Sequence, residues 1–133
     1  MYKVTKHIDF CYGHRLLNYS GKCCHLHGHN ARVEVDLEST ALDDRGMVYD
    51  FADIKERIKL WIDETLDHNM LLNKADPVVA VLQQKGERLY LMAENPTAEN
   101  IAKLIFDHAH ERGLPVVEVR LWETPTSHAS YRA

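Results

Sequence analysis

The sequence predicts a single α+β domain in which an antiparallel sheet carries two helices on one face. Segments near both ends of the chain alternate between apolar and polar side chains, as half-buried strands do. Two segments in the middle repeat apolar residues at helical spacing. The 133 residues, of which 45% are hydrophobic, are enough for one core and too few for two. We therefore expect residues 1–133 to form one domain.

Two strands are expected near the amino terminus, joined by a loop at 15–26. Residues 2–11 have apolar side chains at alternate positions. Residues 30–39 alternate more regularly, so their apolar members are expected to face the core and their charged members to face outward. The inward set is Val33, Val35 and Leu37, and the outward set is Arg32, Glu34, Asp36 and Glu38.

Two helices are expected next. The first runs from about Phe51 to Leu66, with Asp50 as its cap. Its apolar residues recur at helical spacing, so one stripe packs on the sheet: Phe51, Ile54, Ile58, Trp61, Ile62 and Leu66. The second helix starts near Thr97 and stops at Gly113.

The remaining segments complete the sheet. Residues 72–95 predict little beyond an apolar run at 78–82 and a short extended piece at 88–92. After the second helix, residues 117–121 alternate as a third strand, and a short fourth strand is expected at 127–132. Two strands, two helices and two strands in this order indicate one layer of helices on one sheet.

The net charge and the composition of the chain argue against some classes of function. A net charge of −4 and a pI near 6.1 argue against a nucleic-acid or membrane-surface role that depends on bulk charge. No apolar run reaches membrane-spanning length and residues 1–20 do not resemble a signal peptide, so a cytoplasmic location is expected. The cysteines Cys11, Cys23 and Cys24 are expected to be buried, metal-binding or reactive rather than disulfide-bonded.

Three histidines form a candidate metal site. His27 and His29 flank Gly28 at the start of a strand, so both side chains project from the same face. His14 ends the first strand, and antiparallel pairing brings it beside them. Three neutral imidazoles are the ligand set of a catalytic zinc ion with one open position. Two alternatives stay open: no metal at all, and a closed structural site with Cys23 or Cys24 as the fourth ligand.

Other candidate residues lie later in the chain. Asp67 and His68 follow the first helix as a possible proton relay, or as a helix end that interacts with the dipole. Glu123 keeps the inward parity of the third strand and needs a partner, either the amidine-like edge of a ligand or an arginine. Thr97 can simply cap the second helix.

Six motifs in chain order resemble the 6-pyruvoyltetrahydropterin synthase and 6-carboxytetrahydropterin synthase family. They are Phe10-x-x-x-His14-Arg15-Leu16, Cys23-x-x-x-His27-Gly28-His29, Asp50-Phe51, Leu66-Asp67-His68, Asn95-Pro96-Thr97-Ala98-Glu99-Asn100, and Glu123-Thr124 followed by Tyr131-Arg132. Three features depart from the family pattern. Cys24 stands next to Cys23, Tyr12 and Gly13 stand where small residues are usual, and the segment 73–93 is longer than in compact bacterial members.

The resemblance implies the T-fold, in which a four-stranded antiparallel sheet with two helices assembles into an oligomeric β-barrel, commonly a hexamer. It implies Zn²⁺ held by His14, His27 and His29. Cys23 would be the general base, with Asp67 and His68 as its relay. The remaining roles fall on Glu123, which would anchor the pterin ring and join the relay, and on Thr97, whose backbone would line the pocket.

The activity that the resemblance implies is a lyase reaction. The Cys23–His27 spacing is that of bacterial enzymes of queuosine biosynthesis, which convert 7,8-dihydroneopterin triphosphate to 6-carboxy-5,6,7,8-tetrahydropterin, acetaldehyde and triphosphate. A 6-pyruvoyltetrahydropterin synthase is the alternative within the family. A zinc-stabilised binding domain without activity is the alternative from another class. No nucleic-acid or membrane partner is expected.

Overall fold

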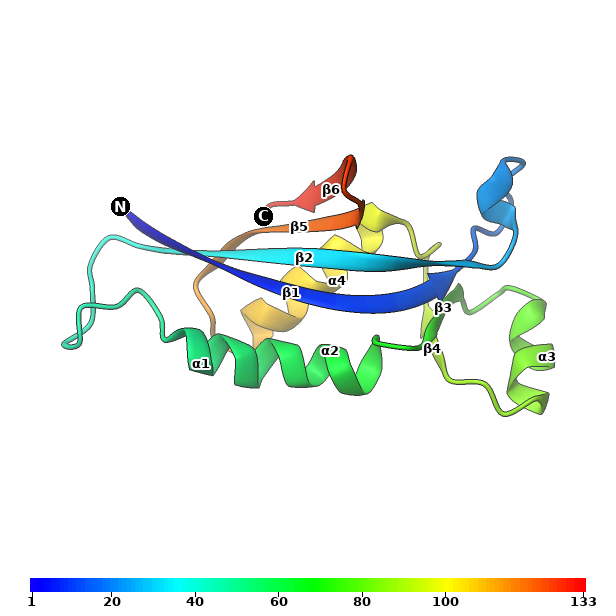
Figure 1. Cartoon of the computed structure of the whole chain (residues 1–133), viewed down its shortest axis with the longest axis horizontal. Helices are drawn as coiled ribbons and strands as arrows, with labels where there is room; N and C mark the ends of the chain where they lie inside the picture. The colour runs from blue at the N-terminus through cyan, green and yellow to red at the C-terminus, as the bar shows by residue number, and fades with distance from the viewer.

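The computed structural model describes all 133 residues. Its six-stranded sheet has the order β4-β3-β1-β2-β5-β6, and helices cover one face of it (Figure 1). The strands are β1 (Tyr2–His14), β2 (His27–Ser39), β3 (Met70–Asn73), β4 (Leu89–Met92), β5 (Val116–Thr124) and β6 (Ser127–Tyr131). The helices are η1 (Lys22–Cys24), α1 (Phe51–Ile54), η2 (Lys55–Lys59), α2 (Leu60–Thr65), α3 (Val78–Gln84) and α4 (Ala98–Glu111).

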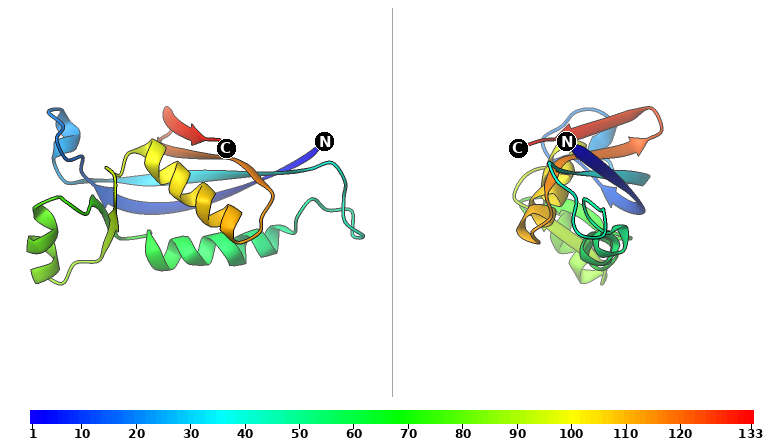
Figure 2. Two further views of the ribbon diagram at one scale, coloured as in Figure 1. Left: turned by 180° about the vertical axis from the view of Figure 1, so that it is seen from behind. Right: turned by 90° about the vertical axis from the view of Figure 1, so that its left-hand side faces the viewer.

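The two long helices lie where the sequence predicts them. α1, the π-helical turn η2 and α2 form one continuous helix, and Asp50 caps it by accepting from the Ala52 N–H at 2.9 Å. α4 crosses the same face of the sheet, and its cap Thr97 accepts from the Asn100 N–H (Figure 2). The predicted stripe of the first helix is wrong at one residue. Phe51 is exposed because it is the first helical residue, before the helix reaches the core.

The α+β class is confirmed, while the sheet contains two strands more than predicted. β3 pairs in parallel with both β1 and β4, so the sheet is mixed rather than purely antiparallel. Both added strands have only four residues. β4 corresponds to the short extended piece expected at 88–92, whereas no strand was expected at the position of β3. α3 covers the apolar run at 78–82, and the Asp76 carboxylate accepts from the Val78 N–H at 2.9 Å at its start. Strands this short are too brief to show an alternation.

β1 and β2 form the long central pair of the sheet. Each has 13 residues, and they pair antiparallel from Tyr2 opposite Ser39 to His14 opposite His27. The inner face of β2 is fully buried under the helices, through Val33, Val35 and Leu37. This burial fixes the register, because a slip by one residue would turn the apolar side chains to the other face.

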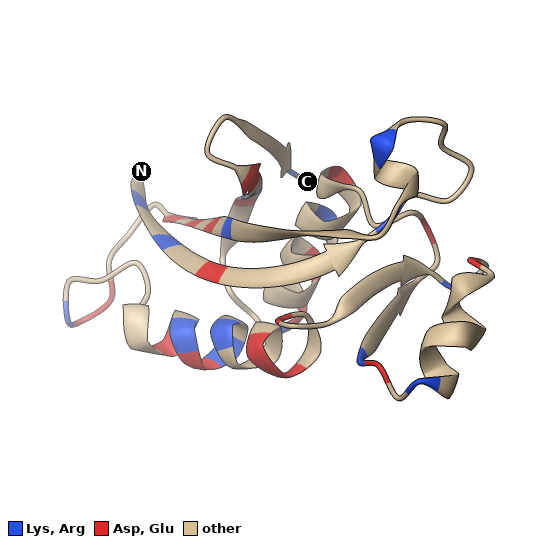
Figure 3. Cartoon of the chain, turned by 45° about the vertical axis from the view of Figure 1, so that its right-hand side comes forward, with Lys and Arg blue, Asp and Glu red and all other residues tan.

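The outer face of the same strands carries charges (Figure 3). Arg120 on β5 donates two hydrogen bonds to Asp36, at 2.7 and 2.9 Å, and Lys3 lies 3.1 Å from the same carboxylate. Asp36 has the outward parity that was predicted, yet its side chain is fully buried because these neighbours cover it. Burial alone would raise the pKa of Asp36, but the hydrogen bonds from Arg120, Thr5 and Lys3 outweigh it and hold the pKa well below the usual range.

No helix of this chain combines the length and the apolar character that crossing a membrane requires.

We predict that Asp36→Ala lowers the free energy of unfolding by about 3 kcal/mol, because it leaves the Arg120 guanidinium without its main buried partner. Asp9→Ala is the matched control, since it removes an ion pair with Arg32 at an exposed site and should cost less than about 1 kcal/mol. Urea unfolding at neutral pH measures both. Equal losses of unfolding free energy in the two variants would show that the Asp36–Arg120 pair stabilises the fold no more than an exposed ion pair does.

The stabilisation from Asp36 should fade as the pH falls below the ordinary pKa of an aspartate, since the pKa of Asp36 in the folded state is depressed.

Candidate active site

The pairing of β1 with β2 brings the three predicted histidines together. His14 and His27 are cross-strand partners, and His29 lies two residues further along β2 on the same face. The Nε2 atoms of His14 and His27 are 3.0 Å apart, and ring nitrogens of all three histidines lie within 4.8 Å of one another. Gly28 allows close approach of the two strands here, because a Cβ at this position would stand 3.1 Å from the Tyr12 carbonyl oxygen and the backbone would have to shift by a few tenths of an ångström.

Backbone carbonyls set the tautomers of two of these imidazoles. Nδ1 of His14 donates to the Pro96 oxygen at 2.7 Å, and Nδ1 of His27 donates to the His25 oxygen at 2.7 Å. Burial lowers the pKa of His14, which favours its neutral form. With Nδ1 protonated, both Nε2 atoms present lone pairs to each other, an unfavourable arrangement unless a cation lies between them. The donor set and its orientation therefore fit a metal ion with imidazole ligands.

Glu123 lies at the same cluster. Its Oε2 is 3.4 Å from His14 Nε2 and 3.3 Å from His29 Nε2. Two ligands of a tetrahedral zinc ion stand about 3.3–3.4 Å apart, given bond lengths of roughly 2.0–2.1 Å. Glu123 therefore borders the three-histidine group through His14 and His29, while the group whose ligand atoms all lie within 4.8 Å of one another consists of the three histidines, without Cys23 or Cys24. The partners of Glu123 are histidines and a tyrosine, and no arginine pairs with it.

Tyr12 is a site residue whose role sequence reasoning missed. Its ring is buried between Phe10, His14 and His29, and its hydroxyl donates to Glu123 Oε2 at 2.8 Å. Burial raises the pKa of Tyr12 strongly, and the nearby Glu123 charge raises it further, so the phenol stays protonated. The available signal was its parity, because Tyr12 shares the inward face of β1 with His14.

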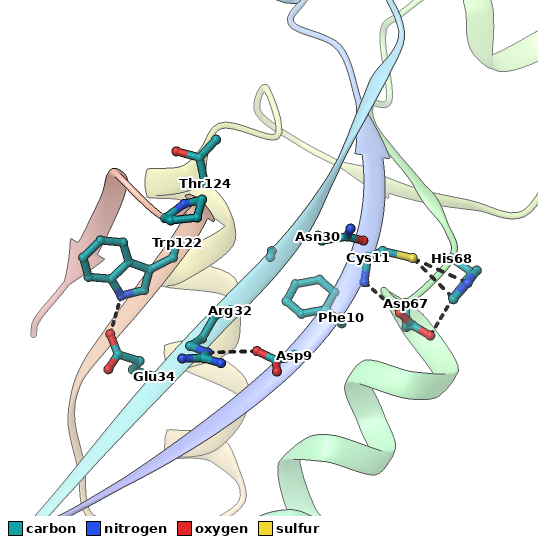
Figure 4. Close-up of a pocket in the computed structure, with 12 residues that line it drawn as sticks. Asp9, Phe10, Cys11, Asn30, Arg32, Glu34, Asp67, His68, Trp122 and Thr124 are labelled. Atoms are coloured by element: carbon teal, nitrogen blue, oxygen red, sulfur yellow. Dashed lines mark hydrogen bonds and ion pairs between the residues drawn. The ribbon is translucent and has the colours of Figure 1, made fainter.

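The predicted relay residues form a second cluster, with Cys11 (Figure 4). His68 Nδ1 lies 2.7 Å from Asp67 Oδ2, and Cys11 Sγ lies 3.5 Å from His68 Nε2. Burial would raise the pKa of Asp67, but hydrogen bonds from the Cys11 N–H and from His68 outweigh it and lower the pKa. The carboxylate is therefore ionised and accepts the Nδ1–H of His68.

Cys23 lies elsewhere, in the short helix η1, and no hydrogen bond joins its side chain to Asp67 or His68. Its backbone is held near the first histidine strand, because the Leu16 N–H donates to the Cys23 oxygen at 2.8 Å. The same loop is tied down by Arg15, which binds Asp76 through two hydrogen bonds of 2.5 and 2.7 Å. The structure thus places Cys23 beside the histidine strands and leaves it without contact to the relay of its own chain.

Thr97 acts as the cap of α4, as its simplest interpretation predicted. The backbone next to it belongs to the site, since the Pro96 carbonyl is the acceptor for His14 Nδ1. A groove of about 470 Å³ runs along β1 and β2, and its lining includes His27, His29 and His68. This groove therefore borders residues of both clusters.

Comparison with known proteins places these features in a family. A sequence model described as 6-pyruvoyl tetrahydropterin synthase matches residues 3–133. A 6-carboxy-5,6,7,8-tetrahydropterin synthase of Rickettsia bellii is 37% identical over 132 residues, covering 94% of this chain and 96% of the relative. The solved structure of an uncharacterized protein from Wolinella succinogenes has a TM-score of 0.81 at 31% identity, covering 98% of this chain and 97% of that one. The 6-pyruvoyl tetrahydropterin synthase of Caenorhabditis elegans has a TM-score of 0.73 at 26% identity, covering 99% and 95%.

The fold, the candidate site and the matches to known proteins together define the class of protein. It is a lyase-type enzyme whose relatives are named tetrahydropterin synthases. The chain belongs to the 6-pyruvoyl tetrahydropterin synthase family. Membership confirms the expected T-fold and decides for an enzyme over a binding domain without activity.

We predict that His29→Ala weakens zinc binding by more than about 100-fold, because it removes an imidazole ligand. Loss of a group that only hydrogen-bonds to a ligand lowers metal affinity by about 10- to 100-fold, and loss of the ligand itself should lower the affinity at least as much. His25→Ala is the matched control. It removes a neighbouring exposed imidazole but keeps the backbone carbonyl that orients His27, so affinity should stay unchanged. Competition with a chromophoric chelator measures both affinities. Equal affinities in the two variants would rule out a three-histidine site.

Proposed function

We propose that the chain is a zinc-dependent 6-carboxy-5,6,7,8-tetrahydropterin synthase that converts 7,8-dihydroneopterin triphosphate to 6-carboxytetrahydropterin, acetaldehyde and triphosphate, as in queuosine biosynthesis. The observation that carries the proposal is the convergence of His14, His27 and His29 with Glu123. Relatives with this printed name support the product, among them that of Rickettsia bellii. The Cys23–His27 spacing supports the same branch of the family.

Zn²⁺ held by the three imidazoles would supply Lewis acidity toward the oxygens of the substrate side chain, which makes neighbouring C–H bonds more acidic. The residues of the chain do the rest. The carboxylate of Glu123 accepts two parallel N–H bonds from the amidine-like edge of the pterin. Tyr12 orients that carboxylate through its 2.8 Å hydrogen bond.

Proton transfer falls to Cys23, Asp67 and His68. The thiolate of Cys23, which positive charge nearby favours, accepts a proton from the substrate and becomes the thiol. Asp67 keeps the Nδ1 proton on His68, which leaves Nε2 free to accept or return a proton. Since His68 contacts Cys11 in its own chain, we propose that it serves Cys23 of a neighbouring copy in a homo-oligomer, a hexamer if the family pattern holds.

The proposed location is the cytoplasm. All three cysteines are free, and free thiols are typical of a reducing compartment.

A 6-pyruvoyltetrahydropterin synthase is the second candidate, and two observations favour it: the description of the matching family model and the similarity to the Caenorhabditis elegans enzyme. The two activities use the same substrate and differ in their products. Only the 6-carboxy reaction releases acetaldehyde.

We predict that zinc-loaded enzyme releases one acetaldehyde per dihydroneopterin triphosphate consumed, and that Cys23→Ala abolishes turnover while it keeps one zinc per chain. Cys24→Ala and Cys11→Ser are the matched controls, because neither thiol has a role in the proposed reaction. Coupled reduction of acetaldehyde by an alcohol dehydrogenase follows the reaction, and elemental analysis gives the zinc content. Substrate loss with a 6-pyruvoyl product and no acetaldehyde would move the assignment to the second candidate.

We predict that Tyr12→Phe raises KM about tenfold with a smaller change in kcat, because a hydrogen bond to a charged group contributes roughly 1.5 kcal/mol and here positions the anchoring carboxylate. The phenyl ring keeps the packing against Phe10, so the melting temperature serves as the control for folding. An unchanged KM would show that the hydrogen bond from Tyr12 does not position the Glu123 carboxylate for substrate binding.

Glu123→Gln should raise KM further than Tyr12→Phe does, since it removes the negative charge that binds the pterin.

A further inference from the structure

A second group of possible metal ligands lies outside the three-histidine site. Cys11 on β1 meets Asp67 and His68 in the turn that follows α2 (Figure 4). Backbone hydrogen bonds hold this turn against the strand: the His68 N–H donates to the Cys11 oxygen at 2.7 Å, and the Gly13 N–H donates to the Asn69 oxygen at 3.0 Å. The three side chains are therefore brought together by the fold rather than by a flexible loop.

The spacing of sulfur and nitrogen in this cluster suits a tetrahedral metal ion. Cys11 Sγ lies 3.5 Å from Nε2 and 3.6 Å from Nδ1 of His68. Zinc bonds of roughly 2.3 Å to sulfur and 2.0–2.1 Å to nitrogen, at a tetrahedral angle, separate the two ligand atoms by about 3.6 Å. The sulfur is nearly equidistant from both ring nitrogens, so it lies along the lone-pair direction of neither. The His68 side chain is 69% exposed, so a small tilt of its ring about the hydrogen bond to Asp67 meets little steric resistance and would aim Nε2 at a bound ion.

Asp67 prepares the imidazole for this role with both carboxylate oxygens. Oδ1 accepts from the Cys11 N–H at 2.9 Å, which ties the carboxylate to β1. Oδ2 accepts from His68 Nδ1 at 2.7 Å, which leaves the Nε2 lone pair free. A carboxylate behind a histidine in this way fixes its tautomer and raises its basicity as a metal ligand.

We propose that Cys11 and His68, oriented by Asp67, bind a second, soft divalent cation of the Zn²⁺ type, with water completing its coordination. A thiolate and an imidazole select such an ion over Mg²⁺ or Ca²⁺, which prefer oxygen. Binding releases the thiol proton of Cys11 to the solvent. A groove of about 770 Å³ that borders the cluster gives the ion access. With fewer protein ligands than the three-histidine site, this site fills second.

The proposed site has a consequence for turnover, which rests on the proposed function. A cation on Nε2 of His68 occupies the lone pair that the relay needs. Zinc in excess of one ion per chain therefore inhibits the enzyme, and the inhibition acts through Cys11.

Titration of the metal-free full-length protein with Co²⁺ alone tests the site, because only a thiolate ligand gives a sulfur-to-cobalt charge-transfer band. The three-histidine site contains no sulfur, so the band is expected to grow with the second equivalent of Co²⁺. Cys11→Ser should abolish the band, while Cys23→Ser and Cys24→Ser should keep it. A band that survives in Cys11→Ser, or binding that stops at one equivalent, would overturn the proposal. Circular dichroism checks that each variant folds, and His68→Gln gives an independent variant that should weaken the second equivalent at least about 100-fold.

Zinc titration of activity separates this proposal from the proposed function. Wild-type turnover is expected to fall once zinc exceeds one equivalent, and Cys11→Ser should resist at least tenfold more zinc. Equal inhibition of both proteins would overturn the inhibitory role of the site. An enzyme with one zinc per chain and no turnover of dihydroneopterin triphosphate would instead refute the proposed function, while the cobalt result would still decide the second site.

Discussion

The pairing register of β1 with β2 is the constraint on which the rest of the structure depends. It sets His14 opposite His27 and at the same time turns the apolar residues of β2 into the core. Side chains alternate with a period of two, so a slip by one residue would expose Val33 and Val35 and separate the imidazoles. The hydrophobic free energy of the buried face therefore also holds the three histidines of the candidate metal site in place. No separate interaction has to select that geometry.

The pairing register of β2 with β5 brings the carboxylate of Glu123 to the three histidines. β2 pairs with β5 from Arg32 opposite Trp122 onward, and an irregularity follows in the pairing of β5 with β6 between Trp122 and Thr124. Glu123 lies at this irregularity, where the ladder is interrupted and the strand can redirect a side chain. Its carboxylate reaches Tyr12, which is 111 residues away in sequence. The cluster of three histidines and Glu123 is thus assembled by three neighbouring strands of one sheet, and the loops contribute to it the carbonyls that orient two imidazoles.

The same physics explains which features could be predicted from the sequence. Long alternating strands and long amphipathic helices carry a periodic signal, and the histidine pair around Gly28 carries a local one. β3 was missed, and β4 was predicted only as an extended piece at 88–92 without a place in the sheet, because four residues cannot display a period and because parallel pairing depends on distant partners. Cys11 and Tyr12 were missed as site residues for a related reason. Their partners lie 56 and 111 residues away, so only the folded sheet reveals them.

Strand β1 couples the two clusters physically. Cys11, Tyr12 and His14 alternate along it, so the strand presents the thiol on one face and the phenol and imidazole on the other. Asp67 holds the backbone of Cys11 with one oxygen and the ring of His68 with the other. His68 adopts a left-handed backbone with φ of 59°, a conformation that non-glycine residues seldom take and that surrounding contacts must maintain. A displacement of β1 at the three histidines would therefore also move the carboxylate that orients His68, because Asp67 is bound to the backbone of the same strand.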